Sequence, residues 1–171
     1  EEVQKHSLRA LLPMRVLGEL EGFANVVDGP IAVRSSSLLE DSHYQPFAGV
    51  YSTYMVPYAG DKYERLSMLS QAIRGVYASV YYRGSKDYMT ATSNVIDQEK
   101  MAVILQEVVG ERHGDIFYPV ISGVARSVNY YPIGDEKAEE GTVSLAMGLG
   151  KYIVDGGVSL RVCPAHPHQV L

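Results

Sequence analysis

Apolar residues after Pro13 recur at steps of three and four, which is the spacing of one face of a helix. Proline suits the first turn of a helix, because its missing N–H is not needed there. Gly29 follows the last apolar position and is placed to cap the C-terminus. The pattern therefore predicts an amphipathic helix that begins at Pro13 and ends at Asp28. Its apolar face consists of Leu17, Leu20, Phe23, Ala24 and Val27.

A longer apolar stripe predicts a second helix from Asp61 to Arg83. Asp61 and Glu64 have the spacing of a capping box, with aspartate in place of the usual serine or threonine. A weaker helical pattern follows over residues 85–93. We expect the long helix to pack its stripe against the core. The stripe consists of Leu66, Leu69, Ile73, Val76, Tyr77 and Val80.

Short runs rich in β-branched and aromatic residues predict the strands. The first covers residues 30–33 and stops at the polar cluster 34–37, and the second covers residues 50–58. Strands and helices without strict βαβ alternation indicate the α+β class, as one domain or subdomain. Further strands are predicted over residues 101–109, 117–128, 142–147 and 158–162, with a short helix over 151–154.

The composition is typical of a globular protein and excludes several other classes. The 171 residues are 46% apolar and 20% charged, close to a globular average, so intrinsic disorder is excluded. A net charge of −5 offers no general attraction for nucleic acid or an anionic membrane. The longest apolar run, Met101–Leu105, is too short to cross a bilayer. The single cysteine, Cys163, favours a reducing compartment, which we expect to be the cytoplasm.

The densest group of candidate functional residues follows the first predicted strand. Arg34 precedes three serines, and Glu40 and Asp41 come shortly after. Arginine suits bidentate recognition of phosphate oxygens, and serine hydroxyls can add donors. The alternative is a polar turn in which the serines satisfy backbone groups and Arg34 pairs with one of the two carboxylates. The residue types leave both interpretations open.

Three further segments have features of a binding site. Gly49 permits close approach of a ligand to the backbone, and Thr53 adds a hydroxyl four residues later. Gln106 and Glu107 interrupt an apolar strand, where backbone groups could meet an adenine edge. The segment 148–151, Gly-Leu-Gly-Lys, has neither Walker nor Rossmann spacing. In isolation, an ordinary turn or an outward-facing strand position explains each segment better.

No metal site is predicted. His6 and His113 are isolated in the sequence, and His166 and His168 lie in a proline-rich terminus that is typical of a solvated tail. Cys163 has no adjacent residue that would identify it as a nucleophile.

Taken in order along the chain, these segments resemble one family over residues 14–162. It is the N-terminal nucleotide-binding domain of the phosphoenolpyruvate synthase and pyruvate phosphate dikinase family. The similarity is most specific over residues 31–53. The matching residues there are Ile31–Ser36, Glu40, Asp41, Phe47–Gly49 and Thr53. The similar segments downstream are Leu105–Val109, Ile121–Val124 and Met147–Gly150.

The resemblance implies an ATP-grasp-like α+β subdomain, with a mixed or antiparallel sheet flanked by helices and Mg-ATP held between two subdomains. Arg34 would contact the phosphates and is the expected catalytic residue. Gln106 and the backbone of residues 107–109 would face the adenine, and the two glycines after residue 147 would shape a nearby turn. The expected nucleotide-binding residues are Arg34, Gly49, Thr53, Gln106, Glu107, Val109, Gly148 and Gly150.

The resemblance also implies a function. In this family the β-phosphoryl group of ATP passes to a histidine on a separate domain and from there to pyruvate. Residues 1–12 would then be a tail or the end of an upstream element, and residues 13–171 part of the nucleotide-binding domain of a larger multidomain protein. The Mg²⁺ ligands, the phosphohistidine domain and the pyruvate domain are expected elsewhere in the parent chain. Two alternatives remain: a non-catalytic nucleotide-sensing or interaction module, and a related dikinase with another acceptor.

Overall fold

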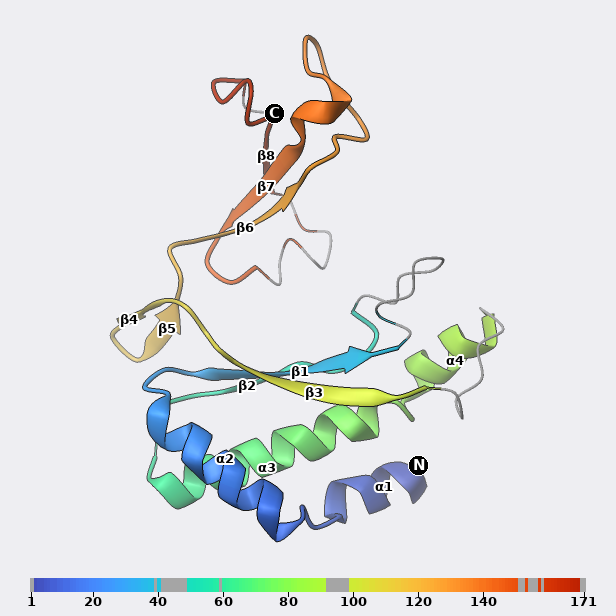
Figure 1. Cartoon of the computed structure of the whole chain (residues 1–171), viewed down its shortest axis with the longest axis vertical. Helices are drawn as coiled ribbons and strands as arrows, with labels where there is room; N and C mark the ends of the chain where they lie inside the picture. The colour runs from blue at the N-terminus through green and yellow to red at the C-terminus, as the bar shows by residue number, and fades with distance from the viewer. Residues whose placement is uncertain are drawn as a thin grey trace. The chain divides into compact units, whose positions relative to one another are not determined.

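The chain divides into two compact units, Glu1–Val108 and Val109–Leu171 (Figure 1). No helix in the described part of the chain combines the length and apolar character needed to cross a bilayer. The computed structural model describes residues 2–38, 40, 49–58, 60–91, 99–150, 153, 157 and 159–169.

The first unit is a three-stranded antiparallel sheet with helices on one side (Figure 1). The strand order is β2-β1-β3, so β1 lies in the middle. Strand β3 pairs with β1 over its whole length, with Ile31 opposite Glu107 and Ser37 opposite Met101. The elements of this unit are α1 (Glu2–Arg9), α2 (Met14–Val26), β1 (Ile31–Ser37), β2 (Tyr54–Val56), α3 (Lys62–Ser79), α4 (Arg83–Ala91) and β3 (Met101–Glu107).

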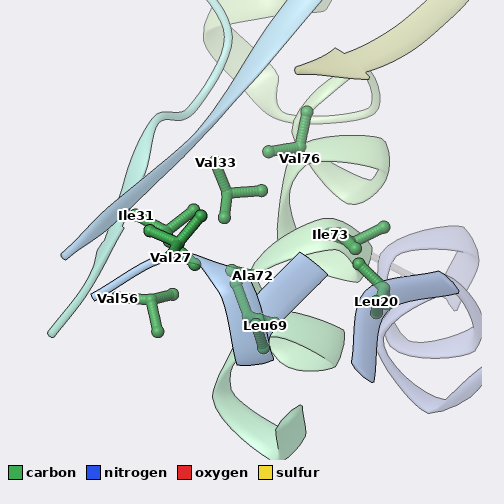
Figure 2. Packing of buried hydrophobic residues seen from close by; sticks show 10 residues of the cluster. Leu20, Val27, Ile31, Val33, Val56, Leu69, Ala72, Ile73 and Val76 are labelled. Carbon is green, nitrogen blue, oxygen red and sulfur yellow. The ribbon is translucent and has the colours of Figure 1, made fainter. Parts of the chain in front are cut away.

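The core lies between the sheet and the helices α2 and α3 (Figure 2). Alternate residues of β1 point into it, and Ile31 and Val33 have no exposed surface. They belong to one apolar cluster with Leu69 and Val76 of α3 and Leu20 of α2. The apolar faces of the helices and the buried face of the sheet thus form a single apolar layer. This arrangement confirms the α+β prediction for this unit.

The C-terminal end of α2 is capped by a distant arginine. Arg65 is 6% exposed, and its guanidinium donates hydrogen bonds of 2.7–2.9 Å to the carbonyls of Ala24, Val27 and Gly29. The expectation that Gly29 caps this helix is wrong, because the capping position is Val27, in extended conformation. A Cβ at Gly29 would lie 3.1 Å from Glu107 Oε1, which is the end of an exposed and flexible side chain.

Several predicted boundaries change in this unit. Strand β1 continues through Arg34–Ser37 instead of stopping before it, since these residues pair with β3. Strand β2 is only Tyr54–Val56, and the predicted long helix ends at Ser79. A separate helix, α4, begins two residues before the weaker pattern predicted over residues 85–93 and overlaps it through Ala91. Tyr77 of the predicted stripe is 42% exposed and lies outside the core.

The second unit contains a hairpin and a three-stranded antiparallel sheet of order β6-β7-β8. The segment predicted as one strand over 117–128 is two strands, separated by Pro119, which has no N–H to donate to a ladder. The strand over 142–147 is confirmed. The elements are β4 (Glu111–His113), β5 (Ile116–Tyr118), β6 (Ile121–Arg126), the 3₁₀ turn η2 (Ala138–Glu140), β7 (Thr142–Met147) and β8 (Leu160–Val162).

A buried polar network holds the long β6–β7 connection of this unit. Arg161 donates to Glu136 at 2.7 Å and to Asn129 at 3.0 Å, and Asn129 in turn donates to Glu136 at 2.9 Å. Ile133 adds a backbone N–H to the same carboxylate. The hydrogen bond from Arg161 is the main reason that the pKa of Glu136 is lowered from its ordinary value.

Candidate functional site

The face of the first sheet that points away from the helices carries the two central candidate residues. On β1 the exposed position is Arg34, and Gln106 is one of the exposed positions of β3. Arg34 lies opposite Ile104, two positions from Gln106 on the same face. The two side chains meet, with Arg34 Nη1 donating to Gln106 Oε1 at 3.4 Å. The antiparallel register therefore brings together two residues that lie 72 positions apart in the sequence.

Apolar side chains surround this pair. Ile104 of β3 is 43% exposed, and Met55 of β2 is 51% exposed on the same side of the sheet. Ala32, opposite both Met55 and Gln106, adds a small residue between them. A surface that combines exposed apolar side chains with one cation and one amide can contact both the flat ring and the anionic part of a small ligand.

The serines after Arg34 have a different role from the one expected. Ser35 and Ser37 are buried and face the helix side of the sheet, opposite to the face that exposes Arg34. Ser35 Oγ donates to Glu40 Oε1 at 2.8 Å, and the Ser37 N–H donates to Glu40 Oε2 at 3.1 Å. The Glu40 N–H returns a bond to Ser37 Oγ. Hydrogen bonds from Ser35 and Ser37 therefore hold Glu40 at the end of β1. Arg34 forms its described hydrogen bond with Gln106 instead of with Glu40. Asp41 lies outside the described residues.

The segment around Gly49 has the backbone that the glycine predicts. Gly49 has φ of +83°, in the left-handed region, and nothing lies within 4 Å of an added Cβ. Thr53 is exposed in the irregular segment between Gly49 and β2. Both residues belong to the first unit, as Arg34 does. Phe47 and Ala48 of the same motif lie outside the described residues.

The remaining candidates lie at the end of β3 and in the second unit. Glu107 is exposed, and the Val108 N–H donates to Pro30 at 2.9 Å, which continues the pairing of β3 with the start of β1. Val109 is 84% exposed and begins the second unit. The structure therefore brings Arg34, Gln106 and Glu107 onto one sheet.

The glycine turn after β7 is held by a serine of β6. Gly148 has φ of +78°, its N–H donates to Val120, and its carbonyl accepts from Ser122 Oγ at 2.6 Å. An added Cβ at Gly150 would lie 3.4 Å from Ser122 Cβ. Gly148 thus provides the left-handed backbone of this turn, with open space around it, whereas a Cβ at Gly150 would make only an ordinary van der Waals contact. Lys151 lies outside the described residues.

Other polar groups give no catalytic arrangement. Cys163 is fully buried, with its Sγ 3.8 Å from Glu140 Oε2. His166 Nε2 lies 3.4 Å from the same oxygen. Among the described residues, no group of three acidic, histidine or cysteine side chains could hold a metal ion.

Sequence reasoning missed two polar residues that shape the molecule, Arg65 and Arg161. Arg65 lies four residues before Leu69 of the predicted apolar stripe. A charged residue in phase with such a stripe was the available signal for a buried cation. Arg161 alternates with apolar residues in a short strand, so nothing local distinguished it from an exposed position.

Comparison with known proteins agrees with the resemblance seen in the motifs. The family model described as pyruvate phosphate dikinase, AMP/ATP-binding domain, matches residues 1–165. The phosphoenolpyruvate synthase of Aeropyrum pernix is 26% identical over 145 residues, which cover 85% of this chain. The chain spans 15% of the length of that relative. A match over residues 1–165 covers nearly all of the sequence, and the chain therefore belongs to the pyruvate phosphate dikinase AMP/ATP-binding domain family.

Proposed function

We propose that the chain is the ATP-binding portion of a phosphotransferase and that the open face of its first sheet binds the nucleotide. The observation that carries the proposal is the pairing of Arg34 with Gln106 on a face that also exposes Ile104. Guanidinium groups bind phosphate oxygens in a bidentate fashion, and an amide can both donate to and accept from a base edge. Membership of an AMP/ATP-binding family supports the same ligand.

The residues present suit ATP in charge and polarity. Arg34 is exposed, and its bond to Gln106 is long, so the guanidinium can leave Gln106 at little cost. That movement is required, because adenine and phosphates are separated by a ribose and one contacting pair cannot serve both ends. Gln106 and the backbone of residues 107–109 would then hold the base, and Arg34 the phosphates. Gly49, Thr53, Gly148 and Gly150 are the further proposed nucleotide-binding residues.

Mg²⁺ would accompany the nucleotide. The described residues provide no cluster that fits a metal ion, so the proposal assigns the metal no ligand among them. What these residues contribute is binding and orientation: a cation at the phosphates and an apolar surface at the base. An arginine placed at the phosphates also stabilises negative charge that develops during phosphoryl transfer.

The proposed reaction passes a phosphoryl group from ATP to a histidine on a separate domain of the parent protein and from there to pyruvate. Support comes from the matched relative, which is named as a phosphoenolpyruvate synthase. The partners are thus ATP and the phosphohistidine and pyruvate domains of the same parent chain. We place the protein in the cytoplasm, which suits a chain with one cysteine.

Calorimetric titration of the complete natural protein with Mg-ATP tests the binding step. A charge-assisted contact is worth about 1.5–3 kcal/mol, so Arg34→Ala should weaken binding roughly 10- to 150-fold. Arg83→Ala is the matched control, because the Arg83 side chain is 94% exposed and lies on α4. Absence of Mg-ATP binding by the unmodified protein, or equal binding by both variants, contradicts the proposal.

A second assay separates catalysis from nucleotide sensing. The complete protein is incubated with ATP labelled at the β-phosphate and examined for an acid-labile protein label, as phosphohistidine gives. Labelling that requires Arg34 supports the phosphotransferase. Tight Mg-ATP binding without any label would instead support the non-catalytic nucleotide-sensing alternative.

A further inference from the structure

The segment Gly49–Thr53, which precedes β2, is held in place by two side-chain contacts from different elements. Tyr51 O–H donates to Glu99 Oε2 at 2.5 Å, and the Ser52 N–H donates to Ser79 Oγ at 3.2 Å. These contacts lie on two of the three residues between the candidate positions Gly49 and Thr53. These two hydrogen bonds stabilise the fold of the segment and also fix the backbone on which the proposed binding residues Gly49 and Thr53 lie.

Tyr51 connects this segment to the start of β3. It is 5% exposed and packs against Val80 and Met89. Its partner Glu99 lies two residues before Met101, the first residue of β3, and also accepts a 2.8 Å bond from the Lys100 N–H. Burial, followed by the bond to Glu99, raises the pKa of Tyr51 well above its ordinary value, so the phenol remains a donor at neutral pH.

Ser79 provides the second contact and is itself fixed. It is fully buried at the last position of α3, and its hydroxyl donates to the Val76 carbonyl at 2.6 Å. The Ser79 carbonyl accepts from Ser85 Oγ at 2.7 Å. The oxygen that receives the Ser52 N–H is thus oriented by the end of a core helix.

We propose that Tyr51 is a positioning residue for the nucleotide site, acting through the backbone that carries Gly49 and Thr53. The inference rests on the proposed function, because those two residues are taken to lie near ATP. Strand β3 carries Gln106, so the bond from Tyr51 to Glu99 fixes the Gly49–Thr53 segment to the strand that holds another site residue. If the segment is ordered before the ligand binds, binding does not carry the entropic cost of ordering that segment.

The test measures Mg-ATP binding and melting temperature for variants of the complete natural protein. Tyr51→Phe removes the hydroxyl that donates to Glu99 and also interacts with Ser37, and we expect binding to weaken about tenfold, on the order of the loss of one hydrogen bond. Glu99→Gln keeps an acceptor and should bind Mg-ATP within about threefold of the unmodified protein, whereas Glu99→Ala should resemble Tyr51→Phe. Tyr63→Phe is the matched control, because Tyr63 is 80% exposed on α3.

A double-mutant cycle distinguishes positioning from general destabilisation. If Tyr51 acts through Thr53, the effect of Tyr51→Phe should fall below about threefold when Thr53 is already valine. An equal effect in both backgrounds overturns the inference, as does a lowered melting temperature with unchanged Mg-ATP affinity. Failure of the unmodified protein to bind Mg-ATP would overturn the proposed function and this inference with it. Normal binding that Tyr51→Phe leaves unchanged would overturn this inference alone.

Discussion

Replacing Arg65 with methionine should destabilise the first unit more than any exposed arginine substitution in it. The change keeps an unbranched apolar side chain but removes the guanidinium that donates to three carbonyls at the end of α2. It also removes a cation that lies 4.6 Å from the ring centre of Tyr58. The carbonyls belong to residues that are buried, so water cannot easily replace the lost donors.

The expected loss of folding stability in Arg65→Met is the difference between two opposing contributions. A buried acceptor left without a partner costs about 1–3 kcal/mol, so three of them cost about 3–9 kcal/mol if none is rehydrated. Removing a buried cation relieves a desolvation penalty of several kcal/mol. That relief applies here, since Arg65 Nε has no hydrogen-bond partner within the described part of the chain. The difference leaves a net loss of about 2–4 kcal/mol.

Hydrogen exchange measures this loss locally, even in a protein with several domains. The amides near the C-terminus of α2 should exchange roughly 30- to 1,000-fold faster in Arg65→Met, which corresponds to the expected loss. Arg83→Met is the control and should change exchange by less than threefold, because Arg83 is exposed and pairs with Asp87 at 3.6 Å. If the two variants exchange alike in α2, the guanidinium does not cap this helix and the reasoning is refuted.

Three further substitutions test the packing and the electrostatics. In Gly75→Ala the new Cβ would lie 2.6 Å from the ring of Tyr54, and we expect thermal unfolding to show a loss of about 1–3 kcal/mol. Gly22→Ala meets open space in α2 and should gain about 0.5–1 kcal/mol; equal effects would contradict the packing argument. Because the folded-state pKa of Glu136 is lowered by Arg161, its stabilisation is complete above the ordinary carboxyl pKa and is lost as the pH falls through the folded value. An acid titration followed by hydrogen exchange should show a shallower loss for Glu136→Gln, and an unchanged profile would contradict that role.

The helices could be predicted because their signals are local. The stripe from Leu69 to Val76 and the cap at Asp61, which accepts the Glu64 N–H at 2.8 Å, both lie within a few turns of one segment. The end of α2 could not be predicted in the same way. Its cap comes from Arg65, 41 residues beyond Ala24, and only the packing of α3 against α2 brings the two together.

The first strand shows a second limit of sequence reasoning. Ser35 and Ser37 look like a polar turn in sequence, but in β1 they alternate onto the buried face and hold Glu40. Pairing with β3 makes these serines part of a strand instead of a turn, and β3 lies more than 60 residues further along the chain. The candidate residues Arg34 and Gln106 could be named from the resemblance, whereas their contact depends on the register between the two strands.

The two faces of β1 explain how an acidic chain could present the proposed anion-binding surface. The net charge of the chain is −5, so a phosphate would be repelled unless positive charge were locally uncompensated. Glu40 is the nearest described carboxylate in sequence after Arg34, yet both its oxygens accept hydrogen bonds from Ser35 and Ser37. These bonds hold the Glu40 side chain with the two serines whose side chains face the helices. If Arg34 binds phosphate as proposed, the serines act on that site indirectly: by binding Glu40, they leave the charge of Arg34 available on the open face. Replacing Ser35 with alanine would release Glu40 Oε1, while the Ser37 backbone N–H would still hold Oε2. A loss of phosphate affinity in Ser35→Ala would then come from a new ion pair between Glu40 and Arg34 instead of from a lost donor.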